Sequence, residues 1–141
     1  MIVFIGLGNV GEKYKETKHN AGFWIMDEMA ARHKISFSPG SGDYVIASKT
    51  DKFHLVKPST GMNRSGNAVS QLIKSKNILP EQICVILDDV DLPLGKIRIK
   101  PVMVLIEAYR ISFTYQTQTT FLGLDLVLAL VKKCVQQKIM Y

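Results

Sequence analysis

Short apolar runs alternate with amphipathic stretches over the first hundred residues. The runs predict buried strands, and apolar positions at helical spacing predict amphipathic helices. The predicted strands are 2–5, 44–48, 52–57, 83–87 and 96–100, and the predicted helices are 17–32 and 67–76. This order predicts an α/β fold, a single domain with a mixed, largely parallel sheet covered by helices. In such sheets, ligand-binding groups collect where strands end at their carboxyl edge.

The pattern changes after Lys100. A continuous apolar run at 102–106 is followed by a Thr/Gln tract at 114–120 and a mostly apolar stretch at 121–131. We find no cap, turn or alternation that organises these pieces. The chain therefore reads as one domain, 1–141, with a regular part at 1–100 and an aberrant or divergent tail at 101–141.

Composition narrows the class of protein. With 47% hydrophobic and 21% charged residues, the chain is neither disordered, collagen-like nor a coiled coil. Its apolar runs are shorter than the ~18 residues of a membrane helix, and no positive charge precedes the first one as in a signal peptide. We expect a cytoplasmic protein with no membrane contact and with Cys84 and Cys134 as reduced thiols. The formal net charge of +6 suits a polyanionic partner.

A glycine motif follows the first predicted strand. Gly6-Leu-Gly8-Asn-Val-Gly11 matches the G-x-G-x-x-G pattern of dinucleotide-binding proteins. That reading requires a helix at the third glycine and an acid at the end of the next strand. The acids at the right distance, Asp27 and Glu28, fall inside a predicted helix instead. A dinucleotide-binding Rossmann-like protein stays as an alternative, beside a glycine turn that binds nothing.

One histidine stands apart from the other two. Lone histidines are more often structural or solvated than catalytic, and His33 at a helix end and His54 in a strand fit that description. His19 lies just after the glycine turn, where Asn9 also projects. A histidine there is suited to accept a proton from water near neutral pH.

Two more polar segments follow predicted strands, and a third segment with basic residues is itself a predicted strand. Asn63 offers a donor and an acceptor in the loop 57–66, although it or Ser65 is equally suited to cap the next helix. The acidic turn 88–91 is suited to bind a metal, to remain solvated, or to orient a histidine. The strand 96–100 places three cations on one face, which fits either an edge strand or a phosphate track.

Together, three segments resemble the bacterial-type peptidyl-tRNA hydrolase family. They are IVFIGLGNVGEKYKETKHNAGF, KPSTGMNRSGNAV and ILDDVDLPLGKIRIK, in that order over residues 1–100. Val10 departs from the proline usual in the family, which we expect only to loosen the turn. The resemblance implies that the chain hydrolyses the ester between a peptide and tRNA during translation, without metal or other cofactor. A non-catalytic RNA-binding module remains the second alternative.

The resemblance also implies roles for individual residues. His19 is then the general base and Asp88 its orienting partner. The implied substrate-binding residues are Asn9, Tyr14, Met62 and Asn63, and the implied tRNA-binding residues are Arg98 and Lys100. The expected partner is peptidyl-tRNA, and the expected state is a monomer.

The tail lacks the segments with which the family continues. A glycine-rich Gly-Gly-His-Asn-Gly-Leu loop and an Arg-Leu-Arg segment are both missing from 101–141. Yet the codons of 105–109 and 120–129, read one frame over, permit His-Arg-Gly-Leu and Phe-Pro-Arg-Leu-Arg-Leu-Gly-Ile-Gly. We hypothesise a reading-frame shift close to Lys100, the alternative being a genuine divergent segment. Without the family's partner strand and basic helix, we expect weak or absent activity and poor solubility.

Overall fold

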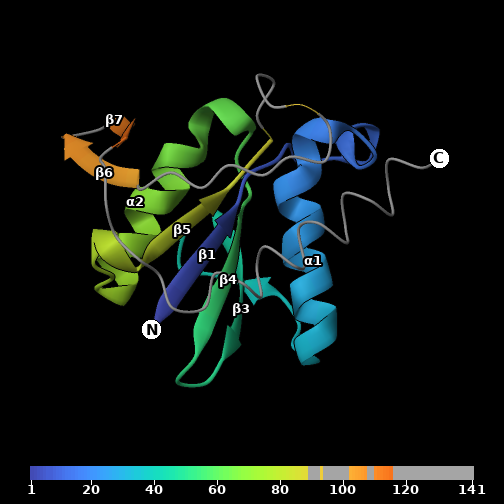
Figure 1. Ribbon diagram of the computed structural model, residues 1–141, viewed down its shortest axis with the longest axis horizontal. Coiled ribbons are helices and arrows are strands. Elements are labelled where there is room, and N and C mark those ends of the chain that lie inside the picture. The colour runs from blue at the N-terminus through green and yellow to red at the C-terminus, as the bar shows by residue number, and fades with distance from the viewer. Residues whose placement is uncertain (89–92, 94–101, 108–109, 116–141) are drawn as a thin grey trace.

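The computed structural model describes residues 1–88, 93, 102–107 and 110–115, the last two ranges by their backbone. Its main sheet has the order β2-β3-β4-β1-β5, with β1 at Ile2–Gly6 in its interior (Figure 1). β1 is parallel to β4 and β5, whereas β3 is antiparallel to β2 and β4. The other strands are β2 Ser38–Pro39, β3 Tyr44–Lys49, β4 Phe53–Pro58 and β5 Ile83–Ile86. This mixed sheet confirms the α/β prediction, with parallel and antiparallel pairs in equal number.

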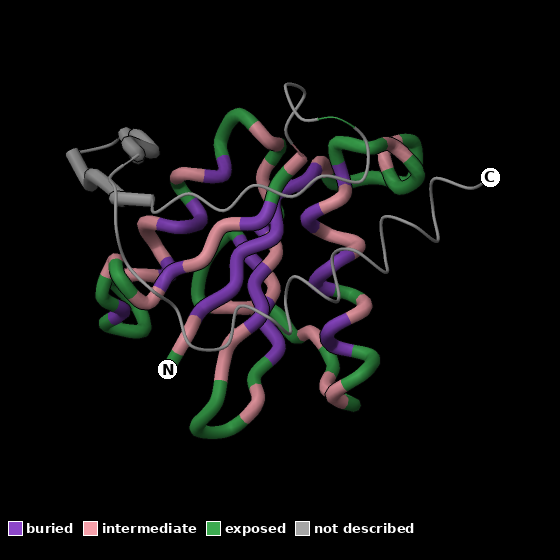
Figure 2. Tube along the Cα trace, in the orientation of Figure 1, coloured by how far each residue is buried: buried purple, intermediate pink, exposed green. Residues whose placement is uncertain are grey.

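Helices α1 (Ala21–His33) and α2 (Ser65–Lys76) cover opposite faces of the sheet. Because alternate strand residues face opposite sides, Phe4 packs with α1 while Val3 and Ile5 pack with α2. Figure 2 shows the buried residues gathered along the central strands and the inner sides of both helices. Burial on both faces explains why β1 reads as a continuous apolar run rather than an alternating one.

The first helix begins four residues later than the sequence predicts. Thr17 is extended, with φ −83° and ψ 146°, and Lys18–Asn20 form a separate 3-10 helix, η2, before α1 starts at Ala21. The predicted helix 17–32 is therefore wrong in its first turn. Because that turn stays outside α1, His19 sits on an exposed corner instead of along the helix.

The strands predicted at 44–48 and 52–57 are confirmed and form a hairpin, and a second hairpin was not predicted. β3 and β4 pair around the turn 50–52, where Asp51 has a left-handed φ of 59°. Beyond the main sheet, β6 (Val102–Glu107) and β7 (Arg110–Tyr115) form a two-stranded antiparallel sheet, with β7 beside α2. β6 is a continuous apolar run, which fits a strand or a buried helix equally well. β7 alternates polar and apolar residues from Arg110 to Tyr115, a strand pattern that the sequence analysis overlooked.

Three strands end side by side at one edge of the sheet. Ile5 pairs with Val56 of β4 and with Val85 of β5, so the residues that follow these strands emerge together. They are the glycine turn after β1, the loop before α2, and Leu87–Asp88. This register confirms the expected collection of polar groups at a carboxyl edge. Within the described ranges, no helix is long and apolar enough to cross a membrane.

Candidate active site

A histidine and a carboxylate meet at this edge. His19, in η2, and Asp88, two residues past β5, place Nδ1 and Oδ2 2.6 Å apart although they are 69 positions apart in sequence. The His19 side chain is 52% exposed and that of Asp88 20% exposed, so the imidazole opens to solvent while its partner is largely covered. With the carboxylate accepting the Nδ1 proton, Nε2 remains free to accept a proton from water.

The carboxamide of Asn9 bridges two of the three loops. Its Oδ1 accepts a hydrogen bond from the backbone N–H of Met62 at 2.9 Å. Met62 begins the 3-10 helix η3 (Met62–Arg64), and its carbonyl accepts a hydrogen bond from the Ser65 hydroxyl at 2.8 Å. Because Oδ1 is occupied, Asn9 presents its amino group as the remaining donor. Asn63, next in the chain, is exposed, and α2 begins with no side-chain cap, so the capping reading of Asn63 is wrong.

Asn20 is a site residue that the sequence reasoning missed. It is 4% exposed, and its carboxamide both accepts from the backbone N–H of Asn9 at 2.7 Å and donates to the Asn9 carbonyl at 2.9 Å. This two-point contact joins the turn that carries Asn9 to the residue directly after His19. The one feature of the sequence that could have pointed to Asn20 is its position next to His19. The amino-acid sequence does not show that this asparagine is buried.

We expect Asn20→Ala to destabilise the fold by about 1–3 kcal/mol, because two partly buried backbone groups of Asn9 lose their partners. Urea denaturation followed by circular dichroism measures the change. Asn67→Ala, at an exposed position of α2, is the matched control and should stay within about 0.5 kcal/mol of wild type. Equal stability of the two variants would contradict the role given to Asn20.

The glycine motif packs α1 against β1 and does not open a helix. A Cβ on Gly6 would lie 2.3 Å from the carbonyl oxygen of Gly22, and one on Gly8 would lie 2.8 Å from the Phe23 ring. The third glycine, Gly11, has φ 119° and leads into the three-residue 3-10 helix η1 (Glu12–Tyr14). Without a helix at that point, and with Asp27 inside α1, the dinucleotide-binding alternative is not supported.

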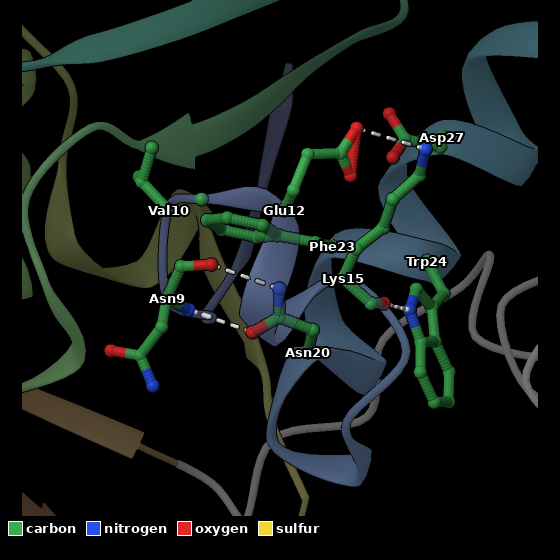
Figure 3. Close-up of a pocket in the computed structure, with 9 residues that line it drawn as sticks. Asn9, Val10, Glu12, Lys15, Asn20, Phe23, Trp24 and Asp27 are labelled. Atoms are coloured by element: carbon green, nitrogen blue, oxygen red, sulfur yellow. Dashed lines mark hydrogen bonds and ion pairs between the residues drawn. The ribbon is translucent and has the colours of Figure 1, made fainter.

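A pocket of about 310 Å³ opens beside the Asn9 turn (Figure 3). Phe23 lies across it, and the indole N–H of Trp24 donates to the Lys15 carbonyl at 2.7 Å. Its rim is charged, with Lys15 Nζ 3.6 Å from Glu12 Oε1. Its lining residues are Asn9, Val10, Gly11, Glu12, Lys15, Asn20, Phe23, Trp24 and Asp27. The hydrogen bonds between the Asn20 carboxamide and the Asn9 backbone join two of these lining residues (Figure 3).

The two other histidines and the described cysteine have structural rather than catalytic surroundings. The His33 ring packs edge-on against Phe53 at 4.9 Å, and His54 Nδ1 lies 2.8 Å from the Ser48 hydroxyl. Partial burial, aided by the Lys76 charge, lowers the pKa of His54, so it is neutral near pH 7. Burial raises the pKa of the free Cys84 thiol, which disfavours a thiolate nucleophile on β5.

Tyr14 lies between the glycine turn and His19. It is half-buried in η1, with Lys13 Nζ 4.8 Å from its ring centroid, and its carbonyl accepts from the Thr17 hydroxyl at 2.8 Å. These contacts hold the chain that connects Asn9 to His19. Its predicted contact with substrate stays a prediction.

Several predicted groups lie outside the described residues. They are Asp89 and Asp91 of the acidic turn, Cys134, and the cationic positions Lys96, Arg98 and Lys100. In the part of the chain that the structure covers, no three potential metal ligands come together. The phosphate track therefore stays a prediction from sequence.

The fold and this edge define an α/β protein with a histidine–carboxylate pair where the segments after β1, β4 and β5 come together. A family model described as peptidyl-tRNA hydrolase matches residues 3–103. The chain belongs to this family.

Relatives and solved structures agree with this assignment. The curated peptidyl-tRNA hydrolase of Enterococcus faecalis is 48% identical over 103 residues, which cover 71% of this chain and 55% of the relative. That of Thermodesulfovibrio yellowstonii is 44% identical over 104 residues, 71% of this chain and 56% of the relative. A crystal structure of peptidyl-tRNA hydrolase from Acinetobacter baumannii superposes with a TM-score of 0.63 at 32% identity, covering 67% of this chain and 50% of that one. The chain thus spans about half the length of the relatives it matches.

Proposed function

We propose that this chain acts on peptidyl-tRNA and hydrolyses the ester between the peptide and the terminal ribose of the tRNA. The observation that carries the proposal is the 2.6 Å contact of His19 with Asp88 at the sheet edge where Asn9 presents its amide. Family membership over residues 3–103 supports the same activity. We propose a cytoplasmic monomer, consistent with the reduced state expected of its thiols.

The proposed chemistry needs only groups that the chain supplies. His19 Nε2 removes a proton from water as the water attacks the ester carbonyl, and Asp88 stabilises the imidazolium that forms. The amides of Asn9 and Asn63 orient the ester and the water and donate to the developing oxyanion. Collapse of the tetrahedral intermediate expels the ribose oxygen, which takes the proton back from His19. An ester is already activated, so no metal is required for this step.

Single-turnover hydrolysis, with enzyme in excess over a labelled peptidyl-tRNA, tests the proposal even when turnover is slow. Release of free tRNA supports it. Binding of the RNA without release would instead favour a non-catalytic RNA-binding module, in which the histidine pair is structural.

We propose that Arg98 and Lys100 contact tRNA phosphates. Arg98→Ala should weaken tRNA binding and lower the slope of log K against log salt by about 1, since one phosphate contact releases about one counterion. Fluorescence anisotropy over a series of salt concentrations measures the slope. Lys49→Ala, at the end of β3, is the control that removes an equal charge from the described sheet. An unchanged slope for Arg98→Ala would remove this residue from the interface.

We also propose that residues 1–100 are the authentic family core and that 101–141 arise from a shifted reading frame. In support, the family match ends at residue 103 and the matched relatives continue well beyond it. The gene's nucleotide sequence over the codons of 99–108 tests this. The shift would be ruled out if the codons of 105–109, read one frame over, do not encode the family's histidine and glycine.

A further inference from the structure

Lys57 is a largely covered cation near the two loops that Asn9 bridges. Lys57, near the end of β4, leaves the sheet on the same face as Leu55, which packs with α1. Its Nζ is 2.5 Å from Asp27 Oδ1, and it lies 4.3 Å and 5.6 Å from the ring centroids of Phe37 and Phe23. The Lys57 side chain is only 18% exposed. A carboxylate and two aromatic rings thus hold this ammonium in place.

This cation reaches Asn9 along two short routes. Phe23, which Lys57 contacts, lies against Gly8 so closely that a Cβ there would meet the ring at 2.8 Å, and Asn9 is the next residue. Along the chain, Lys57 is the penultimate residue of β4, and the loop that follows this strand leads to Met62, whose N–H donates to Asn9 Oδ1. The Lys57 side chain therefore braces the turn after β1 through Phe23, while its backbone leads into the loop after β4.

We propose that Lys57 is a positioning residue, which holds Phe23 against Gly8 and so keeps the Asn9 carboxamide aligned with Met62. Its paired and largely covered ammonium is poorly placed to contact an RNA phosphate. Without it, Phe23 loses its cationic neighbour and Asn9 loses a fixed support. A displacement of about 1 Å at a substrate-orienting amide is enough to lower the rate strongly. The kinetic part of this inference rests on the proposed function.

Two methionine variants form a matched pair for the test. Lys57→Met removes the cation that pairs with Asp27, and Arg32→Met removes the cation whose Nε lies 2.7 Å from Glu28 on the same helix. Both variants delete one ion pair with a carboxylate of α1. Of the two replaced cations, Lys57 is the one that lies over the Phe23 ring. Lys57→Arg is the rescue variant, because a guanidinium keeps both the charge and the stacking on aromatic rings.

The first readout is hydrogen exchange by NMR and does not depend on activity. The Met62 amide is compared with that of Ile5 in the central strand, which reports global stability. We expect Lys57→Met to lower the protection of Met62 relative to Ile5 at least about 10-fold, while Arg32→Met leaves the ratio unchanged. An unchanged ratio in Lys57→Met would overturn the proposal.

The second readout is single-turnover hydrolysis at varied enzyme concentration. We expect Lys57→Met to lower the maximal rate about 10- to 100-fold with an unchanged half-saturating concentration, and Lys57→Arg to recover most of that loss. A raised half-saturating concentration and an altered salt slope at an unchanged maximal rate would make Lys57 an RNA contact and overturn the positioning role. If wild type releases no tRNA, the proposed function fails, and the exchange experiment still decides the role of Lys57.

Discussion

Replacing His19 by alanine should lower the single-turnover rate of ester hydrolysis about 10²- to 10⁴-fold, the usual contribution of a general base. The reason is geometric, because Asp88 occupies Nδ1 at 2.6 Å and leaves Nε2 as the only imidazole atom free to accept the proton of water. The rate is measured with enzyme in excess, and tRNA binding is measured in parallel. Binding should be nearly unchanged, since the proposed phosphate contacts are made by other residues, Arg98 and Lys100.

His54→Ala is the control for the loss of an imidazole. His54 lies on β4 with the Ser48 hydroxyl as its partner. The His54→Ala variant should hydrolyse the ester at the wild-type rate. Near-normal hydrolysis by His19→Ala, with its fold intact by circular dichroism, would remove His19 from the role of base.

Replacing Asp88 by asparagine should lower the same rate about 10²- to 10⁴-fold while leaving the shape of the site intact. An amide lacks the charge that stabilises the imidazolium, and its amino group donates toward Nδ1, which favours the tautomer with the proton on Nε2. That tautomer cannot accept a proton from water at the exposed nitrogen. Asp43→Asn, whose carboxylate accepts from Gln71 at 3.1 Å on the far side of β4, is the matched control.

The double variant separates an orienting role from an independent one. If Asp88 acts only through His19, then His19→Ala combined with Asp88→Asn should be no slower than His19→Ala alone. Losses that multiply would show that Asp88 contributes to catalysis independently, and a wild-type rate for Asp88→Asn would remove it from the mechanism.

Local patterns were enough to predict most of the elements that carry this site. The apolar run before Gly6 appears as β1, which is buried from Val3 to Gly6 between neighbouring strands and helices. The run before Asp88 appears as β5, whose Ile83 and Ile86 are buried, but it ends at Ile86 and leaves the predicted strand residue Leu87 exposed. Such runs survive in any tertiary context, since their side chains have no stable alternative to burial. The order of strands and helices likewise indicated which polar residues share the carboxyl edge.

Errors arose where a local pattern had two physical solutions. Helix-forming residues continue N-terminal to Ala21, but the chain turns through η2 there so that His19 faces Asp88 and Asn20 turns inward to Asn9. The glycine motif fits both a phosphate-binding turn and a close helix–strand contact. A Cβ on Gly6 would lie 2.3 Å from the Gly22 carbonyl oxygen, so the glycine is needed for the close contact of α1 with β1.

The amino-acid sequence by itself determined the chemistry available to this protein, namely an imidazole, a carboxylate and amides placed directly after apolar strands in the order of one family. Only the tertiary structure decided which of them meet. His19 reaches Asp88 across 69 positions because β1 and β5 are adjacent and in register, and Lys57 reaches Phe23 because β4 pairs with β1 on the other side. The physical reason is that strand pairing is a long-range interaction. It joins segments through backbone hydrogen bonds, and the local composition of a strand does not show which other strand it pairs with.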